Sequence, residues 1–326
     1  MSTPAATAEL LEDRGEAAVS DDFFRSRPFL DAERVTHTLR IETAAGELLA
    51  PLIVRPIGDG PERDAISPYG YPGFFPAGRG RASCRIGTES STTPPVEPAE
   101  VDFSATGLVS AFVRHTLGEP ALAGATERNV VQIADPALAP KSRPSDRRQV
   151  RRNLEAGYEL TLAPGAETTP AQRAGFLDLY EQTMRRAGAA EHYFFGLEYF
   201  DRVLAADRTW LVLATAPSGE LAAASIAAVS DGYLHYYLSG SADSHLPDSP
   251  MKNVVSRLVE LSDELRLPLN LGGGISPGDA LEEFKRGFAN RQETWRTSEI
   301  VCDPEAYDRL AAGRDAGGFF PAYRAP

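Results

Sequence analysis

The sequence has few cysteines and no long apolar run. Its two cysteines, Cys84 and Cys302, lie far apart, which excludes a disulfide-stapled scaffold and a zinc site made of cysteines. The longest apolar stretch, Leu221 to Val229, is too short to cross a membrane. The acidic N-terminus lacks the basic and apolar regions of a secretory signal. These absences predict a cytoplasmic protein without a membrane span.

Two kinds of active-site motif are also missing. None of the five histidines has a metal-ligand spacing such as His-Glu-x-x-His, so no metal site is expected. No Gly-x-Ser-x-Gly sequence marks the nucleophile of a serine hydrolase. His235 alternates with Tyr236 on an expected strand, and it can belong either to the core or to a site.

Charge and size are those of an ordinary globular protein with one unusual bias. The 326 residues suffice for one large domain or two modest ones, each with its own core. The net charge of −13 disfavours a protein that coats nucleic acid, although a local basic patch remains compatible with it. Of the 33 basic residues only Lys141, Lys252 and Lys285 are lysines, so each is a candidate for a specific role.

The expected elements alternate helices and strands. In the N-terminal half we expect a loosely held acidic arm over residues 1–28 with a short helix near 8–12, a hairpin (34–43 and 47–57), an ordered Pro/Gly/Tyr loop (67–73), a mobile polar loop (78–100), a helix (103–117) and a strand (129–133). In the C-terminal half we expect helices at 145–156, 170–186, 250–265 and 279–288 and one starting near 304, with strands at 158–162, 209–216, 220–230, 233–239, 267–271 and 293–301.

The second half follows the topology of GNAT acyltransferases. Its order is a helix, three antiparallel strands joined by tight turns, then helix, strand, helix and strand. We therefore expect an α+β protein made of tandem GNAT-like domains, with mixed, mostly antiparallel sheets flanked by helices. The expected divisions are an arm (1–28), an N-terminal domain (29–144), a C-terminal domain (145–312) and a tail (313–326).

Three segments sharpen this likeness. They are Pro68-Tyr-Gly-Tyr-Pro-Gly73, then Tyr236-Tyr-Leu-Ser-Gly-Ser241 with Ser249-Pro250 after it, and finally Leu269-Asn-Leu-Gly-Gly-Gly274 followed by Asp279, Leu281 and Phe284-Lys-Arg-Gly-Phe288. Together they resemble the FemAB/FemX-like aminoacyltransferases and their BioF2-like GNAT relatives. The resemblance covers about residues 30–302. Pro72 stands where the family often has glycine, which makes the first segment the loosest match.

The resemblance implies a reaction. Such enzymes move an amino acid from aminoacyl-tRNA to an amine acceptor, in cell-wall precursor or natural-product biosynthesis. The family's lysine corresponds to Lys285, which would stabilise the oxyanion of the tetrahedral intermediate. The chemistry agrees, because aminolysis of an ester needs a donor aimed where the carbonyl oxygen becomes negative. A solvated helix lysine is the alternative.

Further site candidates follow from the same segments. Tyr69, Tyr71, Tyr236, Tyr237 and Phe284 are expected to bind substrate, with core packing as the alternative for the tyrosines. Gly272 and Gly273 are also placed in the substrate site. They do not open directly into a helix as a dinucleotide loop does, so we interpret them as allowing substrate or a neighbouring backbone to approach closely, or as a turn that needs a positive φ.

A basic run lies between the two halves. It includes Lys141, and its tRNA or phosphate candidates are Arg143, Arg147, Arg148, Arg151 and Arg152. Arg147 and Arg151, like Arg148 and Arg152, are four residues apart and share a helix face. The run is either a phosphate patch or a solvated, salt-bridged face.

The donor is not settled by these motifs. Acyl-CoA-dependent GNAT enzymes bind pyrophosphate at an Arg/Gln-x-x-Gly-x-Gly/Ala loop after the third strand, and residues 240–252 lack one. Arg185-Arg-Ala-Gly-Ala-Ala190 fits that string but lies at the end of a helix, where Gly188 is a C-cap. We therefore expect aminoacyl-tRNA as donor and no bound cofactor. The alternatives are an acyl-CoA- or carrier-dependent N-acyltransferase and a non-catalytic GNAT-like binding protein.

Overall fold

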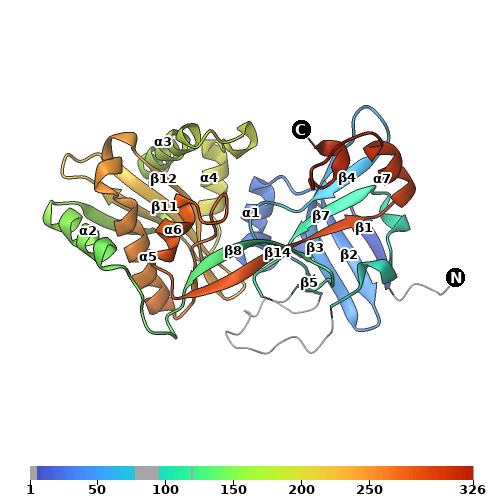
Figure 1. The fold of residues 1–326 in the computed structure, drawn as a ribbon, viewed down its shortest axis with the longest axis horizontal. Helices are drawn as coiled ribbons and strands as arrows, with labels where there is room; N and C mark the ends of the chain where they lie inside the picture. The colour runs from blue at the N-terminus through green and yellow to red at the C-terminus, as the bar shows by residue number, and fades with distance from the viewer. Residues whose placement is uncertain (1–5, 78–94, 119, 326) are drawn as a thin grey trace. The chain divides into compact units, whose positions relative to one another are not determined.

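The computed structural model describes residues 6–77, 95–118 and 120–325 (Figure 1). The predicted mobile loop lies mostly outside these residues, as does Cys84. The chain forms two compact units. Unit 1 takes in the described residues of 6–77, 95–128 and 294–325, and unit 2 takes in residues 129–293. The predicted boundary between residues 144 and 145 therefore falls inside unit 2, and the last strand returns the chain to unit 1.

Unit 1 is built on one mostly antiparallel sheet. Its strands are β1 (Ala6–Leu11), β2 (His37–Thr43), β3 (Gly46–Pro56), β4 (Arg63–Ile66), β5 (Phe75–Pro76), β6 (Val101–Asp102), β7 (Ser110–Arg114) and most of β14 (Arg291–Val301), and its helices are α1 (Arg27–Ala32) and α7 (Pro304–Ala311). The strand order is β6-β1-β2-β3-β4-β7-β14, with β5 paired to β3. Leu39, Ile41 and Leu52 alternate inward along the predicted hairpin, which is confirmed.

Three predictions in unit 1 are wrong. Residues 6–11 form β1, which pairs with β2, because Ala6 and Ala8 alternate into the core as in a strand. Phe23 and Phe24 are fully buried, so this part of the expected arm is folded into the unit. The predicted helix over 103–117 is instead a 3-10 helix (Ser104–Thr106) followed by β7, where alternate side chains enter the core.

Unit 2 is built on six strands with helices on both faces. Its strands are β8 (Thr126–Ala134, from residue 129 onward), β9 (Glu159–Pro164), β10 (Thr209–Thr215), β11 (Leu221–Ser230), β12 (Tyr233–Ser241) and β13 (Leu269–Asn270), and its helices are α2 (Pro144–Glu155), α3 (Pro170–Arg186), α4 (Leu197–Leu204), α5 (Met251–Leu265) and α6 (Ala280–Arg286). The order is β8-β13-β12-β11-β10-β9, and only β12 and β13 run parallel among these neighbours. The predicted antiparallel trio and its flanking helices are confirmed.

Alternating side chains assign the helices of unit 2 to the two faces of its sheet. Val212 of β10 packs with Val254 and Val255 of α5 in one apolar cluster. On the opposite face α3 crosses β11 and β12 at Gly240, where a Cβ atom would lie 2.4 Å from the Leu179 carbonyl carbon. Glycine is therefore required for this close approach.

Local signals explain the helix ends in unit 2. Thr169 and Gln172 form a reciprocal capping box that starts α3 at Pro170, and α3 ends at Arg186 as predicted. Helix α4 was not predicted from the sequence; it is short and follows a loop rich in aromatic residues. Among the described residues no helix combines the length and the apolarity needed to span a bilayer.

Candidate active site

Lys285 lies in the last turn of α6 and is buried, with 8% of its surface exposed. Its Nζ donates a hydrogen bond of 2.6 Å to the carbonyl oxygen of Gly273. The Nζ also lies 6.0 Å from the centre of the half-buried Tyr236 ring. This burial contradicts the alternative of a solvated helix lysine.

The surroundings of Lys285 change its acidity. Burial lowers the pKa of its ammonium from 10.5 to about 8, and the charge of Asp279 opposes this shift. The group is therefore still mostly protonated at neutral pH, yet it titrates within reach of it. An ammonium has three donors, and Gly273 takes one of them. The remaining donors can stabilise a developing oxyanion.

The three glycines after β13 form a turn packed against side chains. Gly272 has a φ of +76°, and a Cβ there would approach Lys285 Nζ to 3.1 Å. A Cβ on Gly273 would lie 2.5 Å from Asn129 Nδ2, and the Asn129 amide donates to the Gly274 carbonyl at 2.8 Å. The atoms that approach these glycines closely are therefore side-chain atoms of Lys285 and Asn129. Gly272 also has the positive φ that was one of the two explanations offered for the glycines.

Asp279 fixes the loop between this turn and α6. Its carboxylate caps α6 by accepting from the Glu282 amide at 2.7 Å, and it accepts from the Ile275 and Ser276 amides at 2.7 and 3.0 Å. These backbone hydrogen bonds, the one from Glu282 first, lower the pKa of Asp279. The carboxylate therefore stays ionised and holds the helix that carries Lys285.

Two buried polar side chains, Asn270 and His235, form a series of hydrogen bonds that ends at the glycine turn. Asn270 Oδ1 accepts from the Gly272 amide at 2.8 Å, and its Nδ2 lies 3.1 Å from His235 Nδ1. His235 Nε2 lies 3.2 Å from the Ser230 carbonyl, which fits a neutral imidazole protonated at Nε2. His235 was predicted to belong either to the core or to a site, and neither Asn270 nor Asn129 was predicted as a site residue. An asparagine two residues before a positive-φ glycine was the available signal for Asn270.

The candidate substrate residues do not all come together. A bulge in the β11–β12 pairing places Tyr236 opposite Ala227 and leaves Tyr237 unpaired with β11. Tyr236 donates to Ser239 Oγ at 2.6 Å and packs against the α5 side with Phe284, whereas Tyr237 hydrogen-bonds Tyr199 of α4 at 2.5 Å. Desolvation raises the pKa of Tyr236 to about 12, so its hydroxyl stays protonated.

The two loop tyrosines belong to unit 1. Tyr71 packs edge-on against Phe24 and Trp295. The Tyr69 side chain is more exposed, and its backbone amide donates to Glu33 at 2.9 Å. Within unit 2 the structure therefore brings together Lys285, Gly272, Gly273, Tyr236 and Phe284 from the predicted set.

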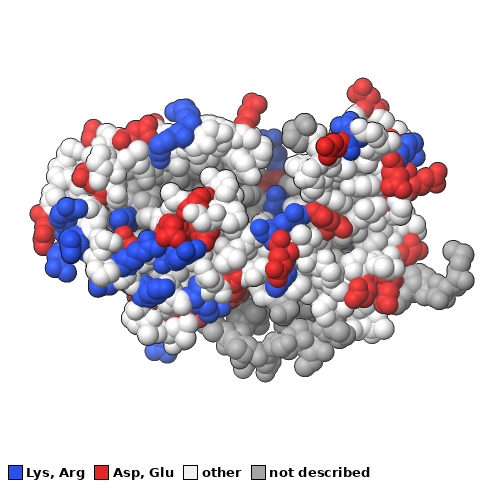
Figure 2. Space-filling model, viewed as in Figure 1, with Lys and Arg blue, Asp and Glu red and all other residues white. Residues whose placement is uncertain are grey.

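The basic run forms α2 and the segment before it, and Figure 2 shows basic side chains gathered over α2 and its neighbours with acidic ones among them. Arg143 pairs with Glu283 at 2.7 Å, Arg147 donates to Ser142, and Arg152 donates to Gln149. Among the described residues the side chains of Arg148 and Arg151 have neither a hydrogen bond nor an ion pair.

The region expected to lack a CoA pyrophosphate loop is a compact turn. Asp243–Asp248 is a 3-10 helix containing Pro247, and Ser249 follows with a φ of +50°. The Arg185–Ala190 string closes α3, and Gly188 has a φ of +60°, as expected for a residue that follows a helix end. The described parts of the chain contain no cluster of three metal-ligating side chains.

Comparisons with known proteins agree with this architecture. Residues 140–286 match the family model of the acetyltransferase (GNAT) domain. The structure of FemX superposes with a TM-score of 0.55 at 10% identity, covering 83% of this chain and 90% of FemX. The C-terminal domain of a putative lysylphosphatidylglycerol synthetase from Agrobacterium fabrum gives 0.55 at 12% identity, covering 90% and 92%.

A third solved structure agrees with these two. L-PGS from Bacillus licheniformis gives a TM-score of 0.53 at 13% identity, covering 82% of this chain and 84% of that one. No curated protein matches the sequence. Likenesses at such low identity show a shared fold. The chain therefore has the FemX-like α+β fold of a GNAT acyltransferase, with the matched acyltransferase domain within residues 140–286.

Proposed function

We propose that the protein transfers an amino acid from aminoacyl-tRNA to an amine acceptor, with Lys285 as the catalytic residue. The single observation that carries this proposal is the buried ammonium of Lys285, held by the Gly273 carbonyl at the end of β13. The resemblance of the Phe284–Phe288 segment to FemAB-like enzymes supports the same role. FemX and L-PGS share the fold, which adds to the support for aminoacyl transfer.

The reaction needs little covalent chemistry from the protein. The acceptor nitrogen attacks the ester carbonyl carbon, and the carbonyl oxygen becomes an oxyanion facing the Lys285 ammonium. The tetrahedral intermediate then collapses, the bond to the ribose oxygen breaks and the amide remains. The amine's proton finally resides on the released ribose hydroxyl. Orientation of the two substrates supplies much of the remaining acceleration.

Donor identity is the sharpest test of this proposal. We would incubate the protein with total tRNA charged with labelled amino acids and a panel of primary amines and small peptides, and follow amide formation by mass spectrometry. RNase added beforehand should abolish the product, because cleavage of the tRNA removes the proposed donor. Amides formed from acetyl-CoA in a mixture free of tRNA would instead establish the acyl-CoA-dependent alternative.

We also propose that α2 contributes to tRNA binding through Arg148 and Arg152. Each phosphate contact contributes about −0.7 to −0.9 to the slope of log affinity against log salt concentration. Replacing both arginines with glutamine should weaken tRNA binding, measured by filter binding over a salt series, and flatten this slope. Lys285 is unchanged in the double variant, so turnover at saturating tRNA should change little.

The matched control removes the same charge elsewhere in unit 2. Arg202 and Arg208 are exposed, and neither lies on α2. Replacing both with glutamine should leave tRNA affinity and its salt dependence unchanged. Equal losses in the two double variants would show that only net charge matters, and no loss in either would place tRNA binding elsewhere.

A further inference from the structure

A hollow of about 370 Å³ lies between α2 and α5, closed by the segment that follows β8. Its walls are mostly apolar, with Leu138, Val150, Leu154 and Val259 as aliphatic members and Phe288 as an aromatic one. Leu138 and Leu154 are 46% and 49% exposed, although leucine is mostly buried in folded proteins. Two exposed leucines in one concave site indicate an apolar ligand surface, because binding sites of this size are typically hollows with apolar walls.

Three cations line the same hollow. They are Lys141, Arg147 and Arg151, and the last two are one helical turn apart on α2. The side chains of Lys141 and Arg151 have no hydrogen-bond or ion-pair partner in the described part of the chain. Of the two carboxylates in the lining, Asp135 is paired with Arg291 at 3.1 Å, which leaves Asp263. The hollow therefore has more cations than carboxylates to balance them.

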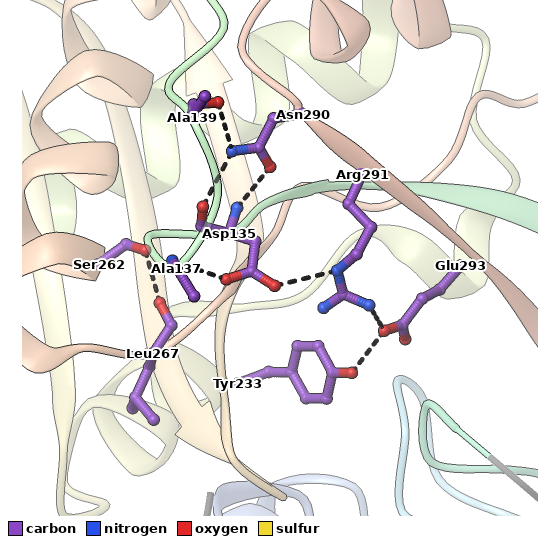
Figure 3. A network of polar contacts seen from close by, with 9 residues as sticks. All are labelled: Asp135, Ala137, Ala139, Tyr233, Ser262, Leu267, Asn290, Arg291 and Glu293. Carbon is purple, nitrogen blue, oxygen red and sulfur yellow. Dashed lines mark hydrogen bonds and ion pairs between the residues drawn. The ribbon is translucent and has the colours of Figure 1, made fainter. Parts of the chain in front are cut away.

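Hydrogen bonds hold the segment after β8 that lines the hollow (Figure 3). Asn290 accepts from the Asp135 amide at 2.8 Å, donates to the Asp135 carbonyl at 2.9 Å and reaches the Ala139 carbonyl at 3.3 Å. Asp135 also accepts from the Ala137 amide at 2.9 Å. These hydrogen bonds shape the segment without a ligand, so a ligand would meet a preformed surface.

We propose that this hollow binds an anionic amphiphile with a single aliphatic chain. The chain would lie against Leu138, Leu154 and Val259, and its carboxylate or phosphate head would contact Lys141 and Arg151. A nucleotide fits less well, because Phe288 is the only aromatic residue among the described residues of the lining, and bases are normally held by stacking. This inference does not rest on the proposed transfer reaction, because no lining residue is assigned to catalysis.

Calorimetric titration with decyl phosphate below its micelle-forming concentration tests the proposal. Decyl phosphate should bind with one-to-one stoichiometry, whereas decanol should bind at least tenfold more weakly because it lacks charge-assisted hydrogen bonds. Decanoate should bind as well, because the proposed site accepts a carboxylate head as well as a phosphate head. Inorganic phosphate and AMP should bind far more weakly than decyl phosphate, because neither fills the aliphatic walls.

Two double variants dissect the site. Lys141→Gln with Arg151→Gln should weaken decyl phosphate binding by about tenfold or more, because two charge-assisted contacts are lost. Leu138→Gln with Leu154→Gln should also weaken it, while circular dichroism confirms that both proteins are folded. The matched controls are Arg148→Gln with Arg152→Gln on the same helix and Leu197→Gln on α4, and both should bind normally.

Several outcomes would overturn the proposal. Decanol or inorganic phosphate binding as tightly as decyl phosphate would show that only one half of the amphiphile is recognised. Tighter binding of AMP would identify a nucleotide site. Binding of decyl phosphate that is equally strong in the Lys141/Arg151 variant and in its Arg148/Arg152 control would place the ligand elsewhere on the protein.

Discussion

Replacing Lys285 with methionine is expected to reduce turnover by about 10²–10³-fold, the usual effect of losing one oxyanion donor. Methionine is preferred to alanine because Lys285 is buried, and an alanine would leave a cavity beside Tyr236. Methionine retains most of the aliphatic stem and removes the ammonium and its hydrogen bond to Gly273. Substrate binding should change much less than turnover, because the donor acts on charge that develops in the transition state.

The control for this variant lies one residue further along α6. Arg286 pairs with Glu282 and Glu283, so its cation is engaged away from the Gly273 carbonyl. Arg286→Met should keep its turnover although it removes one positive charge from the same helix. Both variants should keep a cooperative thermal transition. A folded Lys285→Met protein with near-normal turnover would exclude Lys285 from the reaction.

The two units differ in how well their sequences predict their folds. In unit 2, Asp231-Gly232 is a tight turn between two long apolar strands, and the Thr169 cap marks the start of α3. Local signals and tertiary packing agree there. In unit 1 the apolar residues of 108–113 suit either a helix or a strand, and only pairing with β14 and β4 selects the strand. The secondary-structure propensities of single residues contain no information about such long-range strand pairing.

The candidate site shows the same division. The motif located Lys285 and the glycine turn, because their spacing along the chain is local. Burial of Lys285 could not be predicted, since it depends on how α6 lies against β12 and β13. Adjacent tyrosines 236 and 237 were treated alike, but a bulge and the alternation of a strand send them to different partners. Asn129 reaches Gly274 across 145 residues, a contact that no local pattern encodes.

The second large effect is expected in the pH dependence of turnover. Burial lowers the pKa of Lys285 to about 8, so its cationic fraction falls as pH rises through that value. If the cation stabilises the oxyanion, the ratio of wild-type to Lys285→Met turnover should fall by about tenfold per pH unit above 8. Using the ratio cancels titration of the acceptor amine, because that amine is common to both proteins. A ratio that rises through pH 8 would mean that neutral Lys285 acts as a base.

Folding stability should increase over the same pH range in which the turnover ratio falls. Between the folded pKa of about 8 and the ordinary value of 10.5, the unfolded chain binds more protons at Lys285 than the folded chain does. The free energy of unfolding should therefore increase with pH across this window, by up to about 3 kcal/mol at 1.36 kcal/mol per pKa unit. Urea titrations at pH 8 and 10, with Lys285→Met subtracted, should record about 2 kcal/mol of this increment. Lost turnover accompanied by increased stability would assign the pH effect to the lysine charge, since unfolding would lower both. An unchanged difference between the two proteins would mean that Lys285 titrates at its ordinary pKa and that burial does not alter its charge.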